Sequence, residues 1–227
     1  MSKNRGLVRP VLSCLFAALI SVGAYIAVPL PGTPVPVVLQ NLFIMLAALL
    51  LGPGWGLAAV LVYLSLGTLG LPVFAGGAGG FARFLGPTGG YLLGYVPAAL
   101  AIGFVSRLGA RRRWWRDALA LLAGELLVYG IGLPWLKAAI HADWAKALSA
   151  GLLPFMLGDA VKAVLAVVLA GRLSPLLERA LPRRGGRASD AGVADDGAAD
   201  GGAGSESSAD SVAAGGAGDV GAEGSRG

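Results

Sequence analysis

Apolar runs alternate with short segments rich in glycine, proline or charged residues from residue 11 to about residue 173. Runs of this length and polarity predict membrane-spanning helices. The expected helices cover residues 11–28, 37–51, 55–69, 88–106, 117–137 and 153–173. The second and third are shorter than the about 20 residues of a full span, and Gly52-Pro53-Gly54 between them predicts a tight reversal. The pattern therefore predicts an all-α bundle of six transmembrane helices.

Composition agrees with this pattern. Hydrophobic residues make up 56% of the chain and charged residues 14%, with a mean hydropathy of +0.71. Soluble domains average about 45–50% apolar and about 25% charged residues. The chain is therefore expected to be an integral membrane protein. Cys14 is its single cysteine, so no intrachain disulfide can form.

The basic residues predict the orientation of the bundle. Three lie before the first helix, five between residues 107 and 116, and five between residues 172 and 187. The opposite side holds only Arg83, Lys137 and Lys146. Because basic residues concentrate in cytoplasmic loops, both termini are expected in the cytoplasm. We interpret the basic clusters as anchors to the lipid bilayer and expect no nucleic-acid binding.

Three regions are expected along the chain. Residues 1–10 form a basic cytoplasmic N-terminus, and residues 11–175 form the six-helix transmembrane domain. Residues 185–227 consist mainly of Gly, Ala, Ser and Asp and carry eight acidic residues between Asp190 and Glu223. Such a segment cannot bury a core, so a disordered cytoplasmic tail is expected there.

The segment from Gly70 to Tyr95, between the third and fourth helices, is rich in glycine, proline and aromatic residues. It is too interrupted for a helix and too apolar for a flexible linker. The predicted orientation places it on the outer face, together with the proline-rich turn at Pro29–Pro36 and the loop before the last helix. We expect this Gly-rich segment to act as a lid over a small-solute cavity.

Away from their ends, the expected spans contain only three charged residues, namely Glu125, Asp159 and Lys162. Asp159 and Lys162 are three residues apart and therefore share one face of the last helix. They form either an ion pair that neutralises itself or an acceptor and a donor for a polar ligand. Glu125 is either a neutral, hydrogen-bonded carboxyl or part of a proton relay.

Polar and aromatic residues near the outer face complete the expected cavity. Gln40 and Asn41 open the second helix, Tyr91 opens the fourth, and Trp135 lies near the outer end of the fifth. Amides offer donors and acceptors to a neutral head group, and aromatic faces enclose an apolar ring. Trp135 has an equally plain interpretation as an interfacial anchor.

Sequence motifs for other chemistry are missing. No Walker-type phosphate loop occurs, so no ATP site and no cofactor are expected in this chain. His141 and Cys14, the single members of their types, lie far apart and predict no metal site. No serine, histidine and carboxylate set suggests catalysis, and we expect no enzyme activity.

Four spaced motifs resemble the BioY family, the biotin-binding S components of energy-coupling factor (ECF) transporters. They are GLPVFAGG at residues 70–77, LGPTGGYL at 85–92, VPVVLQ at 35–40, and GLLPF at 151–155 leading to GDAVK at 158–162. The resemblance covers roughly residues 10 to 175. It implies biotin uptake by a substrate-binding subunit that works with a transmembrane coupling protein and two cytoplasmic ATPases.

The resemblance also implies site residues. Asp159 would accept a ureido N–H of biotin, and Lys162 would donate to an oxygen of the ligand. The full set expected to bind substrate is Asp159, Lys162, Tyr91, Gln40, Asn41, Gly77, Phe74, Arg83 and Trp135. Family members dock on the coupling protein through small residues of the first helix, which here are Ala17, Ser21 and Ala24.

Two other function classes stay open at this level. One is an S component or secondary transporter for another vitamin or small solute. The other is a membrane enzyme that uses Glu125 or Asp159 as a general base, for which the sequence offers no nucleophile.

Overall fold

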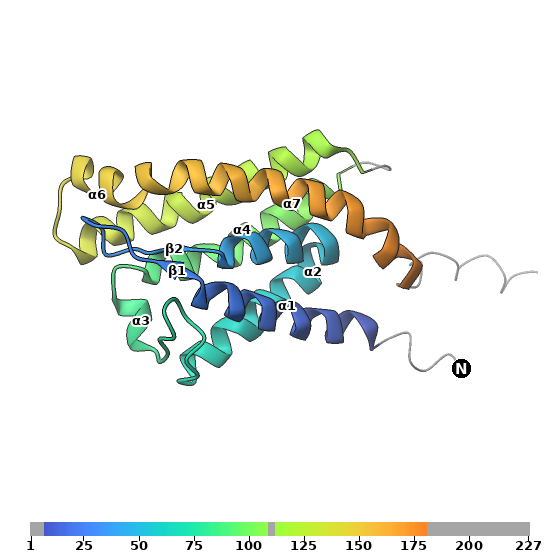
Figure 1. Cartoon of the computed structure of the whole chain (residues 1–227), viewed down its shortest axis with the longest axis horizontal. Helices are drawn as coiled ribbons and strands as arrows, with labels where there is room; N and C mark the ends of the chain where they lie inside the picture. The colour runs from blue at the N-terminus through green and yellow to red at the C-terminus, as the bar shows by residue number, and fades with distance from the viewer. Residues whose placement is uncertain (1–6, 109–111, 181–227) are drawn as a thin grey trace, which may run out of the picture. The chain divides into compact units, whose positions relative to one another are not determined.

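The computed structural model describes residues 7–108 and 112–180. Predictions for the first six residues, for residues 109–111 and for the acidic tail at 185–227 lie outside the described residues. Figure 1 shows the elements in space. In chain order they are α1 (Val8–Tyr25), β1 (Ala27–Val28), β2 (Val37–Val38), α2 (Gln40–Thr68), α3 (Ala82–Leu85), α4 (Gly89–Ser106), α5 (Trp114–Ala139), α6 (Trp144–Gly151) and α7 (Leu153–Ala180).

Helix α2 contains the reversal that the sequence predicts between its second and third helices. Gly52 has φ 81° and ψ −173°, which is not helical. A Cβ added to Gly56 would lie 2.7 Å from the Cα of Ala48. In a straight helix these two residues would be about 12 Å apart along the axis. The two halves of α2 therefore fold back on each other at Gly52.

Five helical segments of the described chain are long and apolar enough to cross a membrane. This count takes α2 as one segment and joins α6 to α7. The expectation of six spans therefore depends on counting the two halves of α2 separately.

Several connections differ from the sequence prediction. The expected proline-rich turn is a small hairpin, in which Ala27 pairs with Val38 and Val28 with Val37. The expected loop before the last helix contains α6, which begins where the Asp143 side chain accepts a hydrogen bond from the Lys146 N–H. Helix α7 runs to Ala180, beyond the predicted end at residue 173. Local capping and pairing of this kind are weak signals in a sequence dominated by hydrophobicity.

The basic segments meet at one end of the bundle. Ser13 Oγ donates to the Trp55 carbonyl at 2.9 Å, which joins the start of α1 to the turn in α2. The guanidinium of Arg107, just after α4, lies against Gly52 of the same turn. Burial and the positive charges of Arg9 and Arg112 lower the pKa of Arg107. We call this the basic end, and Figure 1 shows the hairpin, α3 and α6 at the opposite end.

The small residues expected to dock a partner do not form an open face on α1. Ala17 is 1% exposed and Ala24 is fully buried, because this side of α1 packs against α2. The Ala24 carbonyl accepts a hydrogen bond from the Gly76 N–H of the Gly-rich segment. Ser21 Oγ donates to the Ala17 carbonyl within the helix. Ala17 and Ala24 therefore pack within this chain, and docking of a partner at these residues stays a prediction.

Candidate ligand-binding site

The Gly-rich segment folds into a fixed cover at the end opposite the basic residues. Phe74 pairs with Ala78 in an isolated bridge, and the Gly80 N–H donates to the Gly67 carbonyl at 2.7 Å. The Phe74 ring is 2% exposed and meets Phe84 edge-on at 5.9 Å. This segment is therefore held by its own backbone bonds and aromatic contacts.

Glycine at position 89 permits the join between this cover and α4. A Cβ there would overlap the carbonyl oxygen of Phe84 in the segment before it. Gly89 is the first residue of α4, so this close approach fixes where the cover lies on α4.

A cavity lies under the cover. The volume available to water is about 100 Å³, several times the about 10–15 Å³ that one water molecule needs. Its walls come from the hairpin, the start of α2, the cover, α4, α5 and α7. The lining residues are Pro34, Val35, Pro36, Val38, Gln40, Asn41, Phe74, Ala75, Arg83, Thr88, Tyr91, Leu92, Tyr95, Val128, Tyr129, Phe155, Asp159 and Lys162.

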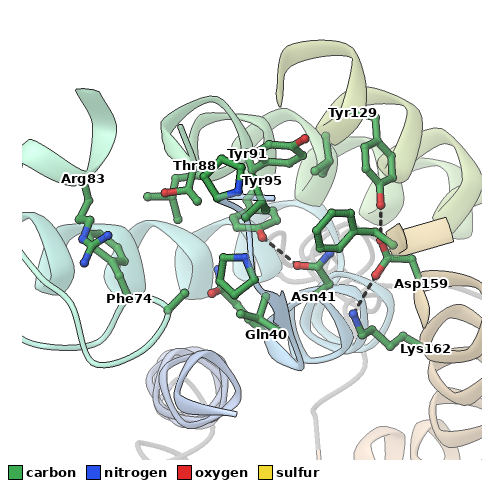
Figure 2. A pocket seen from close by; sticks show the side chains of 18 residues that line it. Gln40, Asn41, Phe74, Arg83, Thr88, Tyr91, Tyr95, Tyr129, Asp159 and Lys162 are labelled. Atoms are coloured by element: carbon green, nitrogen blue, oxygen red, sulfur yellow. Dashed lines mark hydrogen bonds and ion pairs between the residues drawn. The ribbon is translucent and has the colours of Figure 1, made fainter. Parts of the chain in front are cut away.

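Asp159 and Lys162 form the charged part of the wall. Lys162 Nζ lies 2.8 Å from Asp159 Oδ1, and the two residues are 8% and 6% exposed. Tyr129 Oη donates to the other carboxylate oxygen, Oδ2. Figure 2 shows the three side chains joined in this order. Asp159 and Lys162 therefore form an ion pair, and both also line the cavity, where they are accessible to a polar ligand.

Two amides lie beside this group. Gln40 is 2% exposed, and its Nε2 has no hydrogen-bond partner among the described residues. Asn41 Oδ1 accepts a hydrogen bond from Tyr95 Oη at 2.8 Å. A buried amide donor without a partner is costly, so Gln40 offers an unfilled donor to a molecule in the cavity.

Apolar side chains and one cation complete the walls. Tyr91 Oη donates to the Gly151 carbonyl at 2.9 Å, which leaves its ring edge as the surface toward the cavity. Phe74, Leu92 and Phe155 add apolar area. Arg83 is exposed, and Figure 2 shows it across the cavity from Asp159 and Lys162.

Two predicted site residues are not brought to the cavity wall. The Trp135 indole donates its Nε1–H to the Gly86 carbonyl at 3.0 Å, so it supports the cover from behind. Gly77 lies against the ring of Tyr25 on α1. Glu125 lies on α5 but does not line the cavity either.

The structure adds lining residues that the sequence did not single out. Tyr129 is the most informative, since it bonds Asp159 directly. It follows Glu125 by four residues and so shares its helix face. This spacing is the feature of the sequence that could have identified Tyr129 as a site residue. Thr88 and Phe155 belong to the recognised motifs, but nothing in their types marked them as lining residues.

Comparison with known proteins agrees with the geometry. The family model for BioY matches residues 1–179. The chain belongs to the BioY family. A probable biotin transporter BioY of Pyrococcus horikoshii is 46% identical over 162 residues, which cover 71% of this chain and 93% of the relative. The biotin transporter BioY of Thermotoga maritima is 41% identical over the same length and coverage.

One solved structure has the same fold. It is the crystal structure of the S-component for biotin from an ECF-type ABC transporter, with a TM-score of 0.72 and 34% sequence identity. The match covers 77% of this chain and 95% of that one. This BioY chain therefore has the architecture of an S component.

Proposed function

We propose that this BioY protein is the biotin-binding S component of an ECF-type transporter and takes up biotin across the plasma membrane. The observation that carries the proposal is one buried cavity that holds a carboxylate, an ammonium group and two amides under a glycine-rich cover. The names of the relatives support biotin as the ligand. Transport rather than enzymatic turnover is the activity of such a subunit, so the general-base role considered for Glu125 and Asp159 is set aside.

Biotin fits the distribution of polar groups in the cavity. Its ureido group has two N–H donors and a carbonyl, its thiophane ring is apolar, and its tail ends in a carboxylate. Asp159 accepts a ureido N–H, and Gln40 Nε2 donates to the ureido carbonyl. The tail points toward Arg83, because that cation is exposed and has no ion pair within the described residues.

The membrane topology follows from charge and aromatic residues. The basic end lies in the cytoplasm, the cover lies outside, and the two halves of α2 count as separate spans, which gives six spans with cytoplasmic termini. Exposed tryptophans mark both boundaries: Trp114 and Trp115 begin α5 at the basic end, and Trp144 begins α6 at the other.

The energy for uptake comes from partner proteins. The sequence contains no Walker-type phosphate loop. A transmembrane coupling protein and two cytoplasmic ATPases complete the transporter.

Substituting the charged pair tests the binding site. We expect Asp159→Asn and Lys162→Ala each to weaken biotin binding at least about tenfold, because each leaves a buried partner unpaired. Binding is measured with labelled biotin on protein in detergent or nanodiscs. Asp143→Asn and Lys146→Ala provide a matched control, because they form the same spacing on α6 away from the cavity. Near-native affinity of both site variants would refute the assignment.

A ligand screen separates biotin from other solutes. Thermal unfolding of the wild-type protein is compared with biotin, dethiobiotin, thiamine and riboflavin. Biotin is expected to raise the melting temperature most, since a ligand that binds only the folded state stabilises it. A larger rise with thiamine or riboflavin would identify an S component for another vitamin.

A further inference from the structure

Glu125 is a half-buried residue whose carboxyl has no role in the proposed ligand site. Its Oε2 atom is buried and has no hydrogen-bond partner among the described residues. A carboxylate in a membrane span is costly unless it is paired or functional. Glu125 does not line the cavity, so direct contact with the ligand does not account for it.

Two contacts fix how α5 and α7 lie beside each other. Tyr129 of α5 bonds Asp159 of α7, and Arg112, just before α5, bonds Ser174 near the end of α7. The chain therefore runs in opposite directions in the two helices.

This register places Glu125 and Lys162 at one depth. Glu125 precedes Tyr129 by one helical turn, and Lys162 follows Asp159 by nearly one turn. At about 1.5 Å per residue, Glu125 lies roughly 6 Å and Lys162 roughly 4.5 Å along the helix axes from the Tyr129–Asp159 bond, both on its cytoplasmic side. They therefore lie at a similar depth on neighbouring helices, within electrostatic range of each other.

Among the titratable groups near Glu125 in the described residues, Lys162 is the one cation. Tyr95 of α4, Tyr129 of α5, and Asp159 and Lys162 of α7 lie within range of electrostatic interaction with Glu125. Lys162 has three N–H donors, and Asp159 Oδ1 is its one hydrogen-bond partner within the described residues. Lys162 thus has unused donors at the depth where Glu125 has an unused acceptor.

We propose that Glu125 is a second carboxylate partner of Lys162 and thereby a positioning residue for the ligand. When a ligand N–H binds Asp159 Oδ1, Lys162 turns toward Glu125, and its charge stays compensated. Without Glu125, the ligand competes with Lys162 for Asp159. The identity of the ligand rests on the proposed function, but the pairing of Glu125 with Lys162 does not.

Affinity measurements test the effect on the ligand. Glu125→Gln is expected to weaken biotin binding about tenfold relative to wild type, a typical coupling between neighbouring groups. Glu125→Asp keeps the charge and is expected to bind more tightly than Glu125→Gln. Glu206→Gln, in the acidic segment beyond the bundle, controls for the loss of one negative charge. Wild-type affinity in Glu125→Gln, or equal affinities of the Gln and Asp variants, would overturn the proposal.

Thermal unfolding without ligand tests the pairing itself. Glu125→Gln is expected to lower the melting temperature of the wild-type protein, because it removes a partner of Lys162. In a Lys162→Met background the same change is expected to raise it, because two buried carboxylates then lack a cation. A shift of the same sign in both backgrounds would show a merely structural role and overturn the proposal. A wild-type protein that shows this sign change but does not bind biotin would refute only the proposed function.

Discussion

At the residue scale, the site consists of a few polar groups whose partners come from the same helix or from a neighbouring one. The Asp159 carboxylate is held on both oxygens, by Lys162 one turn away and by Tyr129 of α5. Residues in an apolar interior keep one orientation only when such bonds hold them. Tyr129 therefore orients the Asp159 carboxylate, which we propose binds the ligand. We assign Tyr129 itself no direct contact with biotin.

Removing the Tyr129 hydroxyl tests this positioning role. We expect Tyr129→Phe to weaken biotin binding about fivefold, which corresponds to about 1 kcal/mol for one hydrogen bond. The dissociation constant is measured as for the charged pair. Tyr25→Phe serves as the control, because Tyr25 is 54% exposed on α1 and belongs to no hydrogen bond of the described residues. An unchanged constant in Tyr129→Phe would show that Lys162 alone orients Asp159.

At the element scale, the reversal inside α2 decides how many times the chain crosses the membrane. Gly52 adopts positive φ with extended ψ, a conformation that is essentially restricted to glycine. Its missing side chain also leaves the space in which the Arg107 guanidinium lies. Gly52 thus joins the two antiparallel halves of α2 and contacts Arg107 at the end of α4.

Substitution at this turn is expected to destabilise the fold. Gly52→Ala should cost about 1–3 kcal/mol through backbone strain, with further loss from displacing Arg107. For a protein of this size, that corresponds to a melting temperature lower by roughly 2–12 °C.

Gly54→Ala is the matched control, because no atom lies within 4 Å of a Cβ added there. Biotin affinity at low temperature should be unchanged in both variants, since the turn is at the end opposite the cavity. Equal melting temperatures of the two variants would contradict the role given to Gly52.

At the scale of the whole molecule, the helical bundle has two chemically different ends. Guanidinium groups gather around the turn in α2, and the ligand cavity, the cover and α6 occupy the other end. Separation of this kind orients a membrane protein, because basic segments remain in the cytoplasm. In the proposed topology, the cavity lies at the outer end of the bundle.

Cysteine labelling tests this orientation. In a Cys14→Ala background, Pro31→Cys in the hairpin is expected to react with an impermeant maleimide in intact cells. Leu108→Cys, exposed at the end of α4, should react only after the membrane is permeabilised. The reverse pattern would invert the proposed topology, and labelling of both in intact cells would contradict six spans.

The sequence by itself determined the fold class, the family and most of the cavity. Apolar runs broken by glycine and proline suffice to predict spans, because burying backbone in lipid leaves few alternatives to helices. Rare charged residues within those runs pointed to Asp159 and Lys162, and their positions near the outer face pointed to Gln40, Asn41 and Tyr91. Arg83 and Phe74, which belong to the expected set, also line the cavity.

Only the tertiary structure decided which faces and which depths come together. Ala17 and Ala24 are buried against α2 and the cover, and Trp135 supports the cover from behind, although their residue types alone suited a partner or a ligand. The Tyr129–Asp159 bond, on which the proposed pairing of Glu125 with Lys162 rests, depends on the register between α5 and α7. The physical reason is that helical periodicity defines the faces of each helix, whereas packing between helices selects the partner of each face.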